Sequence, residues 1–117
     1  YFLYYEEHDW AERIKRAGYK VYYVPDSLVL HKESMSTGKQ SPLKTYYITR
    51  NRFLFARRNI QGFKKMVTLM YLSFFAFPKG VVSFLFDKRP DLALATMKAY
   101  FWNFIHFSDI RRNQLLK

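Results

Sequence analysis

The residues with the clearest chemical potential lie in the first ten positions of the chain. An aromatic run, Tyr1–Tyr5, is followed directly by the carboxylates Glu6, Glu7 and Asp9. Apolar flanks desolvate a carboxylate and raise its pKa toward a value suited to proton abstraction. Acidic side chains are also favoured at the positive end of a helix. The cluster therefore predicts either a general base at the mouth of a site or an acidic helix start after a buried strand.

A second candidate is His31, which ends a short apolar run and precedes the polar loop Glu33–Gln40. A histidine at a strand end beside a loop can ligate a divalent cation. A histidine in this position also commonly does no more than hydrogen-bond to the neighbouring loop. No second ligand lies beside His31 in the sequence, so both interpretations stay open.

The elements that would position these residues form an α+β pattern that is predominantly α. Residues 8–18 have apolar positions at helical spacing and end at Gly18, a natural helix stop. Tyr19–Val24 is rich in β-branched and aromatic residues and predicts a strand, and Ser27–His31 predicts a second short one. Ser41-Pro42 is a typical helix opening, so we expect a helix to about Asn59.

The rest of the chain predicts further amphipathic or apolar helices, three or four in all. Met66–Phe77 is almost wholly apolar but shorter than the roughly 20 residues of a bilayer span. Val81–Phe86 and Leu92–Phe107 follow. Lysines at the borders and many aromatic residues are typical of helices at the membrane–water interface. A buried helical core and a re-entrant hairpin turning at Pro78–Gly80 are the alternatives.

Composition and charge narrow the class of protein. The chain has 117 residues, of which 50% are hydrophobic and 21% aromatic, so it is too apolar to be disordered. It has no cysteine, which excludes disulfides and thiolate metal sites. Residues 1–40 carry no net charge, whereas residues 41–117 hold fourteen Lys/Arg against three Asp/Glu and so carry the whole net charge of +11. A basic, aromatic segment suggests an anionic membrane or nucleic acid as partner.

The order of the motifs resembles the C-terminal half of family 2 glycosyltransferases, most closely the rhamnosyltransferase-like branch. About half of the chain carries the resemblance. Its pieces are Phe2-Leu3-Tyr4-Tyr5-Glu6-Glu7-His8-Asp9-Trp10, Arg13, Ala17-Gly18-Tyr19-Lys20, Tyr23-Val24-Pro25, Leu28-Val29-Leu30-His31, Tyr46-Tyr47 and Arg50-Asn51-Arg52.

The resemblance implies a GT-A fold and a single inverting displacement at the sugar carbon. One carboxylate deprotonates the acceptor hydroxyl, and Glu7 matches that base, where the family usually has Asp. Glu6 and Asp9 are the other catalytic candidates. The remaining implied roles are substrate or phosphate binding by Trp10, Arg50 and Arg52, and ligation of Mg²⁺ or Mn²⁺ by His31.

The family's nucleotide-binding half, with its Asp-x-Asp motif, precedes the acidic pair and is not in these residues. We therefore expect a fragment of a longer protein: residues 1–59 as the end of a catalytic domain, and 60–117 as a basic aromatic tail. Alone it should be inactive and prone to self-association through exposed apolar surface. The implied partners are a nucleotide-sugar donor, a saccharide or lipid-linked acceptor in surface polysaccharide synthesis, and the inner face of the plasma membrane.

Two other classes compete with the glycosyltransferase. One is a noncatalytic amphipathic module that docks a larger protein on a membrane. The other is a nucleic-acid binder, which we disfavour because the apolar runs are too continuous for a solvated groove and no binding signature is present.

Overall fold

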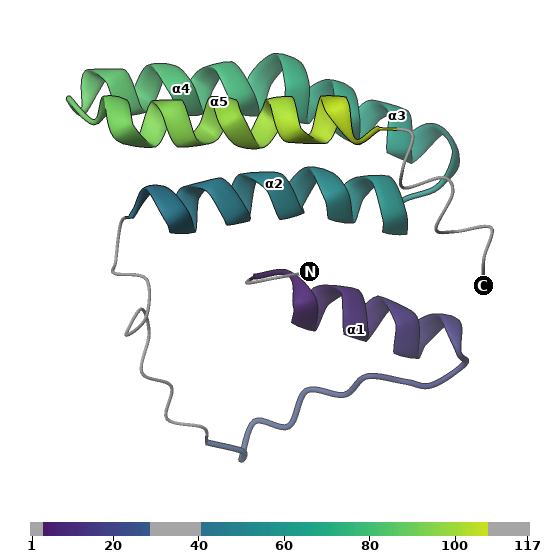
Figure 1. Ribbon diagram of the computed structural model, residues 1–117. Helices are drawn as coiled ribbons and strands as arrows, with labels where there is room; N and C mark the ends of the chain where they lie inside the picture. The colour runs from purple at the N-terminus through teal and green to yellow at the C-terminus, as the bar shows by residue number, and fades with distance from the viewer. Residues whose placement is uncertain (1–3, 29–40, 108–117) are drawn as a thin grey trace.

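The computed structural model describes residues 4–28 and 41–107, and this part of the chain is predominantly helical, as predicted (Figure 1). Within these residues there is no strand, so the α+β class is confirmed only in its helical part. The elements in chain order are α1 (Glu6–Arg16), α2 (Pro42–Asn59), α3 (Gly62–Tyr71), the π-helical segment η1 (Leu72–Ala76), α4 (Phe77–Phe86) and α5 (Pro90–Ile105).

The two predicted strands are not confirmed. Tyr19–Val24 has no strand structure, and its side chains are exposed, Tyr23 to 90%. An isolated extended segment leaves its backbone groups unpaired, and no described residue pairs with it as a sheet neighbour. Of the second predicted strand, Ser27–His31, residues 27 and 28 also form no strand, and His31 lies outside the described residues.

Helix α1 begins at Glu6, so the acidic pair lies inside its first turn rather than before it. The predicted stop at Gly18 is confirmed. Gly18 has φ +88°, and the Tyr19 N–H donates to the carbonyl of Ile14 at 3.2 Å, which closes a Schellman motif. α1 buries no residue among those described, and Trp10, one of its predicted apolar positions, is 67% exposed.

Helix α2 is the central element and lies between α1 and the pair formed by α4 and α5 (Figure 1). Its predicted start is confirmed: the Ser41 hydroxyl accepts a hydrogen bond from the Lys44 N–H at 3.2 Å, and Pro42 is the first helical residue. Its Phe53 and Ala56 form the core with residues of η1 and α5. The full set is Phe53, Ala56 and Leu72, with Ile60, Leu69, Ala76 and Tyr100 packed against them.

The chain does not turn at Pro78–Gly80; α3, η1 and α4 run on as one helix, Gly62–Phe86. The alternative of a hairpin at that point is therefore wrong. The π-helical segment offers the reason, because its wider turn, in which the Phe77 N–H donates to the carbonyl of Leu72, makes room for the ring of Pro78, which has no N–H. The reversal comes later, between α4 and α5.

The two predicted apolar runs, Met66–Phe77 and Val81–Phe86, lie on one helix that is longer than either run alone. The helix Gly62–Phe86 has 25 residues and is long and apolar enough to cross a membrane, by length and composition alone. It lies on the surface, with only 6% of its most apolar stretch buried. Its exposed large apolar side chains are Phe63, Met66, Val67, Met70, Tyr71, Phe74, Phe75, Val82, Leu85 and Phe86. The coarse prediction of a membrane-associated segment is thus supported.

The turn between α4 and α5 contains a backbone conformation that suits glycine, yet a lysine occupies it. Lys88 has φ 55°, and its N–H and that of Arg89 donate to the carbonyls of Leu85 (3.1 Å) and Phe84 (2.8 Å). A side chain in the left-handed region costs about 1–2 kcal/mol, of which the lower chain entropy of a non-glycine residue in the unfolded state offsets a part. We expect Lys88→Gly to raise the free energy of unfolding by about 0.5 kcal/mol, measured by urea denaturation.

The matched control is Lys79→Gly, at an exposed helical position of α4. Glycine inside a helix costs about 1 kcal/mol, so this variant should lose stability. If both substitutions destabilise the protein equally, the strain assigned to Lys88 is contradicted.

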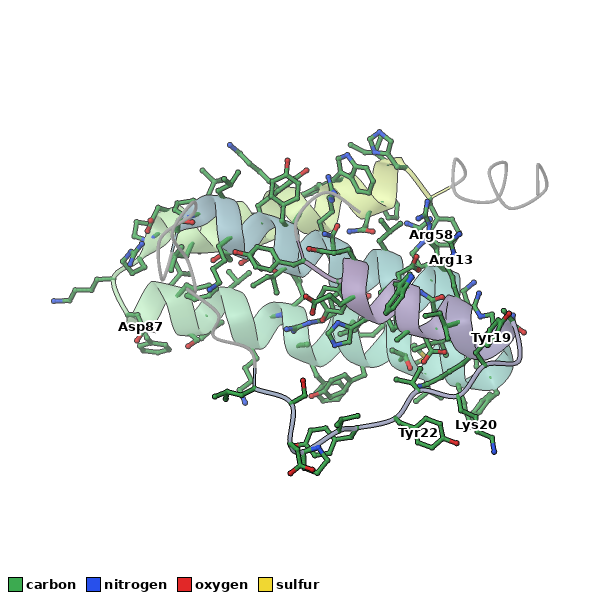
Figure 2. All side chains as sticks on the ribbon, turned by 90° about the horizontal axis from the view of Figure 1, so that it is seen from below. Arg13, Tyr19, Lys20, Tyr22, Arg58 and Asp87 are labelled. Carbon is green, nitrogen blue, oxygen red and sulfur yellow. The ribbon has the colours of Figure 1, made fainter. Side chains whose placement is uncertain are left out.

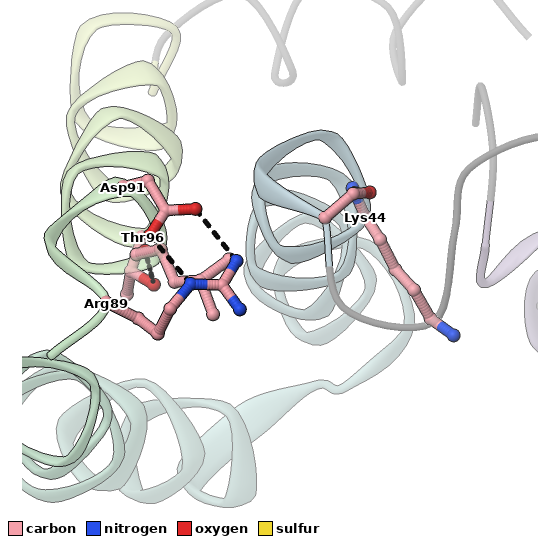
Figure 3. Close-up of polar contacts among 6 residues, drawn as sticks. Lys44, Arg89, Asp91 and Thr96 are labelled. Carbon is pink, nitrogen blue, oxygen red and sulfur yellow. Dashed lines mark hydrogen bonds and ion pairs between the residues drawn. The ribbon is translucent and has the colours of Figure 1, made fainter. Parts of the chain in front are cut away.

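Arg89 and Asp91 form an ion pair at the start of α5 (Figure 3). Arg89 Nε donates to Asp91 Oδ1 at 3.0 Å and its Nη2 to Oδ2 at 2.8 Å. These hydrogen bonds lower the pKa of Asp91 below its ordinary value. A lowered carboxyl pKa gives stability that is present above about pH 3.9 and is lost as the pH falls through the folded-state value.

We therefore expect Asp91→Asn to melt at a lower temperature than the unchanged chain at neutral pH. The difference should shrink to nothing in strong acid, where Asp91 is protonated in both states. Melting temperatures followed by circular dichroism across this pH range test the expectation. A difference that persists undiminished in acid would show that Asp91 acts through something other than its charge.

Candidate functional site

The acidic cluster lines an open hollow on α1. The lining residues are Glu6, Glu7, Asp9, Trp10 and Arg13, and the volume is about 450 Å³. The structure thus brings together all three predicted catalytic carboxylates and Trp10. Figure 2 looks at the molecule from this side, with Arg13 on α1 and the extended segment through Tyr19, Lys20 and Tyr22 following it. The exposed Trp10 ring offers an apolar face and an N–H donor beside these carboxylates.

The start of α1 is tied to the middle of α2 by two hydrogen bonds. Asn51, which is fully buried, donates from its side-chain nitrogen to the carbonyl of Tyr4 at 3.0 Å. Arg52 Nε donates to the hydroxyl of Tyr5 at 3.3 Å. Tyr4 and Tyr5 have φ values of 63° and 70°, which non-glycine residues rarely adopt. These bonds hold the strained dipeptide that leads directly into the acidic pair.

A second link joins α1 to the end of α2 and separates the roles of the three carboxylates. Asn59 donates from Nδ2 to Asp9 Oδ1 at 2.9 Å, and Arg16 donates to Asn59 Oδ1. Asp9 is therefore engaged in fastening the two helices together. Glu6 and Glu7 are exposed, and among residues 4–28 and 41–107 neither pairs with a cation.

The aromatic residues that flank the carboxylates pack on α2 rather than around the acidic pair. The ring of Tyr5 lies 5.3 Å from that of His8 and 5.7 Å from that of Phe55. His8 and Phe55 meet edge to face at 6.2 Å. The desolvation of Glu6 and Glu7 that the sequence suggests is therefore not provided by the described residues, which leave both side chains exposed.

The two arginines predicted to bind phosphate are separated by the structure. Arg52 is exposed and reaches the start of α1 through Tyr5. Arg50 lies elsewhere on α2, against the ring of Trp102 on α5. Residues two apart on a helix point about 200° apart, so the two side chains cannot serve one phosphate together. Of the two, only Arg52 contacts the residues that lead into α1, and it does so without lining the acidic hollow itself.

The described residues do not by themselves fit a metal centre. Within residues 4–28 and 41–107 there is no group of three or more His, Cys, Asp or Glu side chains able to hold an ion. His31, the predicted ligand, lies outside the described residues. The expected Mg²⁺ or Mn²⁺ therefore finds no complete set of ligands in this part of the chain.

The sequence does not reveal that three polar residues of α2, Asn51, Arg57 and Asn59, hold the helices together. In the sequence, Asn51 is part of the Arg50-Asn51-Arg52 motif, Asn59 ends the predicted helix, and no motif assigns a role to Arg57. Arg57 is buried and donates to the carbonyls of Asn103 (2.9 Å) and Phe107 (2.6 Å), which fixes the end of α5 on α2. Amide and guanidinium groups within an otherwise apolar helix are the signal that was available.

Comparison of the chain with protein-family models, with curated protein sequences and with solved structures found no match.

Proposed function

We propose that this chain supplies the acceptor side of an inverting, nucleotide-sugar-dependent glycosyltransferase, as part of a longer protein. The product would be a saccharide of surface polysaccharide synthesis, with rhamnose as one candidate donor sugar. Glu7 is the proposed base, Trp10 in the same hollow is a proposed substrate contact, and Arg52, bonded to Tyr5 beside the start of α1, is the proposed phosphate contact. The proposal keeps Mg²⁺ or Mn²⁺ as the cation of the longer enzyme, with His31 as the one predicted ligand in this chain.

In the proposed step, a carboxylate oxygen of Glu7 takes the proton of an acceptor hydroxyl. The hydroxyl oxygen forms the new bond to the anomeric carbon while the bond from that carbon to the diphosphate oxygen breaks. The nucleotide diphosphate leaves with the electron pair, and Arg52 offers a guanidinium for the negative charge that develops there. The carboxylate must sit within hydrogen-bond reach of the hydroxyl, and an exposed Glu7 at a hollow is free to do so.

The observation that carries the proposal is the contact between two motifs 47 residues apart. The hydrogen bonds Asn51–Tyr4 and Arg52–Tyr5 place the Arg-Asn-Arg segment of α2 against the entry to the acidic pair. A helix fastened in this way could hold its carboxylates in one orientation, which a general base needs. Neither motif alone would support a site; their adjacency does.

We propose further that the protein is cytoplasmic and peripheral on the inner face of the plasma membrane. α1 and the α4–α5 pair lie on opposite sides of α2 (Figure 1). The helix Gly62–Phe86, with its many exposed apolar side chains, thus contributes to the layer on the other side of α2 from α1. Such a placement would keep the hollow in water while the protein stays close to a lipid-linked acceptor. The positive charge of residues 41–117 favours an anionic surface.

The test of the proposal is sugar transfer by the longer protein, assayed with a panel of nucleotide sugars and saccharide or lipid-linked acceptors in the presence of Mn²⁺. Transfer with inversion at the anomeric carbon is the expected result. The 117-residue chain alone should not bind nucleotide sugars in calorimetric titrations, because the donor-binding half is expected elsewhere. Micromolar binding by this chain alone would contradict the division of roles proposed here.

A noncatalytic membrane-docking module is the second candidate, favoured by the exposed apolar surface of the 25-residue helix Gly62–Phe86. The two candidate functions differ in the role of the acidic hollow, which is catalytic in the first and has no catalytic role in the second. A docking module would bind vesicles equally well with or without Glu7 and would support no transfer in any longer form of the protein.

A further inference from the structure

The side chain of Arg50 is held in an aromatic cage on the α2–α5 side of the molecule. Its guanidinium carbon lies 4.7 Å from the ring centre of Tyr47, 4.8 Å from that of Trp102 and 5.9 Å from that of Tyr46. The far side of the cage is built up by His106, whose ring stacks on Trp102 at 4.4 Å. Because three rings from two helices surround its guanidinium, the side chain of Arg50 is held in place, unlike that of a mobile surface arginine.

The cage leaves the two terminal nitrogens of the Arg50 guanidinium available to an anion. Arg50 Nε donates to Asn51 Oδ1 at 3.1 Å, and Asn51 is itself fully buried. Among the residues that the structure describes, the two terminal nitrogens of Arg50 donate to none. A planar guanidinium with two terminal nitrogens left over in this way matches the oxygens of a phosphate. Since the rings and Asn51 already fix the side chain, binding would cost little further ordering.

An apolar hollow adjoins the cage and shares two of its rings. Tyr46 and Trp102 line it together with the outward-facing side chains of α5, and its volume is about 640 Å³. Leu94, Met97 and Phe101 of α5 are 52%, 41% and 57% exposed. Lys98 places a cation in this lining, in addition to Arg50 in the adjoining cage. The cage of Arg50 and the apolar hollow therefore adjoin through the shared rings of Tyr46 and Trp102.

We propose that Arg50 and this hollow, together the α5 groove, bind an anionic membrane phospholipid, with the phosphate at Arg50 and an acyl chain along α5. A free phosphate would use the guanidinium but gain nothing from the apolar side chains. An apolar peptide would use the side chains but leave the cations without a partner. Only an amphiphile with a phosphate head matches both parts, and the exposed apolar helix Gly62–Phe86 brings the protein to where such molecules are. This site does not depend on the proposed glycosyl transfer.

Binding to vesicles tests the phosphate contact. Arg50→Lys keeps the positive charge but loses the planar fork, so plain attraction to a negative surface would leave the affinity unchanged. We expect a loss of about tenfold in affinity for phosphatidylglycerol-rich vesicles. The matched control is Arg58→Lys, the same exchange on the same helix outside the cage, which should change affinity by less than about twofold. Equal behaviour of the two variants overturns the proposal.

The fluorescence of Trp102 tests occupancy of the groove. The chain has two tryptophans, so Trp10→Phe leaves Trp102 as the only tryptophan, whose emission is excited selectively at a wavelength that tyrosine does not absorb. A short-chain anionic phospholipid carrying brominated acyl chains, kept below its micelle concentration, should quench Trp102. Inorganic phosphate at the same concentration should not compete. Quenching that phosphate abolishes would identify a free-phosphate site, and no quenching at all would exclude a lipid; either result overturns the proposal.

Folding of the variants is checked by far-ultraviolet circular dichroism. If the Arg50→Lys variant loses helical signal, Phe101→Ser is the variant to test in its place. Phe101 is exposed, so its removal spares the packing of α5. This variant should lose quenching by the lipid while keeping its helical signal. Unchanged quenching in folded Phe101→Ser would place the acyl chain elsewhere and refute the groove.

Discussion

Replacing Glu7 with Gln in the longer enzyme should lower the rate of sugar transfer by about 10²–10⁴-fold. The amide has the shape of the carboxylate but cannot accept the proton of the acceptor hydroxyl. Glu7 lies in the first turn of α1, makes no ion pair among the described residues and is exposed, so the exchange should leave the helix intact. The measurement is initial transfer rate at saturating donor and acceptor, with helicity checked by circular dichroism.

Glu12→Gln is the control, because Glu12 is on the same helix and outside the hollow. It contributes an ion pair with Lys15, 3.3 Å long, which is worth about 0–1 kcal/mol at a surface. Its transfer rate should match that of the unchanged enzyme. If Glu6→Gln abolishes transfer while Glu7→Gln does not, the base has been assigned to the wrong carboxylate of the pair. If neither change matters, the mechanism is refuted.

Arg57→Met should lower the free energy of unfolding by about 3 kcal/mol. The guanidinium donates to the carbonyls of Asn103, His106 and Phe107 at 2.9, 3.4 and 2.6 Å. Helices leave their last carbonyls without partners inside the helix, and a cation is favoured there. Methionine fills much of the same volume but donates nothing, so buried carbonyls at the end of α5 would be left unsatisfied.

Urea denaturation of the chain followed by circular dichroism provides the measurement for Arg57. Burial lowers the pKa of Arg57, and the nearby charge of Arg58 lowers it further, which shows that the site is partly desolvated. Lys98→Met serves as the control, because Lys98 is exposed on α5 and its loss should stay within about 0.5 kcal/mol. Two equally small effects would mean that the end of α5 does not depend on Arg57.

The elements that could be predicted from the sequence are those with local signals. Ser41 and Pro42 specify the start of α2 through a side-chain cap and a fixed backbone angle, and both act there as expected. Gly18 ends α1 because the left-handed conformation needed there is cheap for glycine. In each case the decisive interaction lies within a few residues along the chain, so the local sequence pattern is sufficient to predict the helix end.

The parts that could not be predicted depend on distant partners. Tyr19–Val24 has the composition of a strand, but a strand needs a neighbour, and composition does not supply one. Pro78 and Gly80 suggest a turn, but packing of the helix on α2 and α5 outweighs that local preference. The same holds for the site: the acidic cluster is visible in the sequence, whereas the bond from Asn51 to Tyr4 spans 47 residues and is not.

The π-helical segment Leu72–Ala76 sets the rotation of everything that follows it. One surplus residue in a helical turn advances the next turn by about 100° around the axis. Leu72, at the start of the segment, faces the core beside Phe53, and with that advance Phe77 faces Tyr100, the two rings stacked at 4.3 Å. A relative that lacked the surplus residue would present a different side of α4 to α5. Length variation among related chains should therefore be strictly limited within this short stretch.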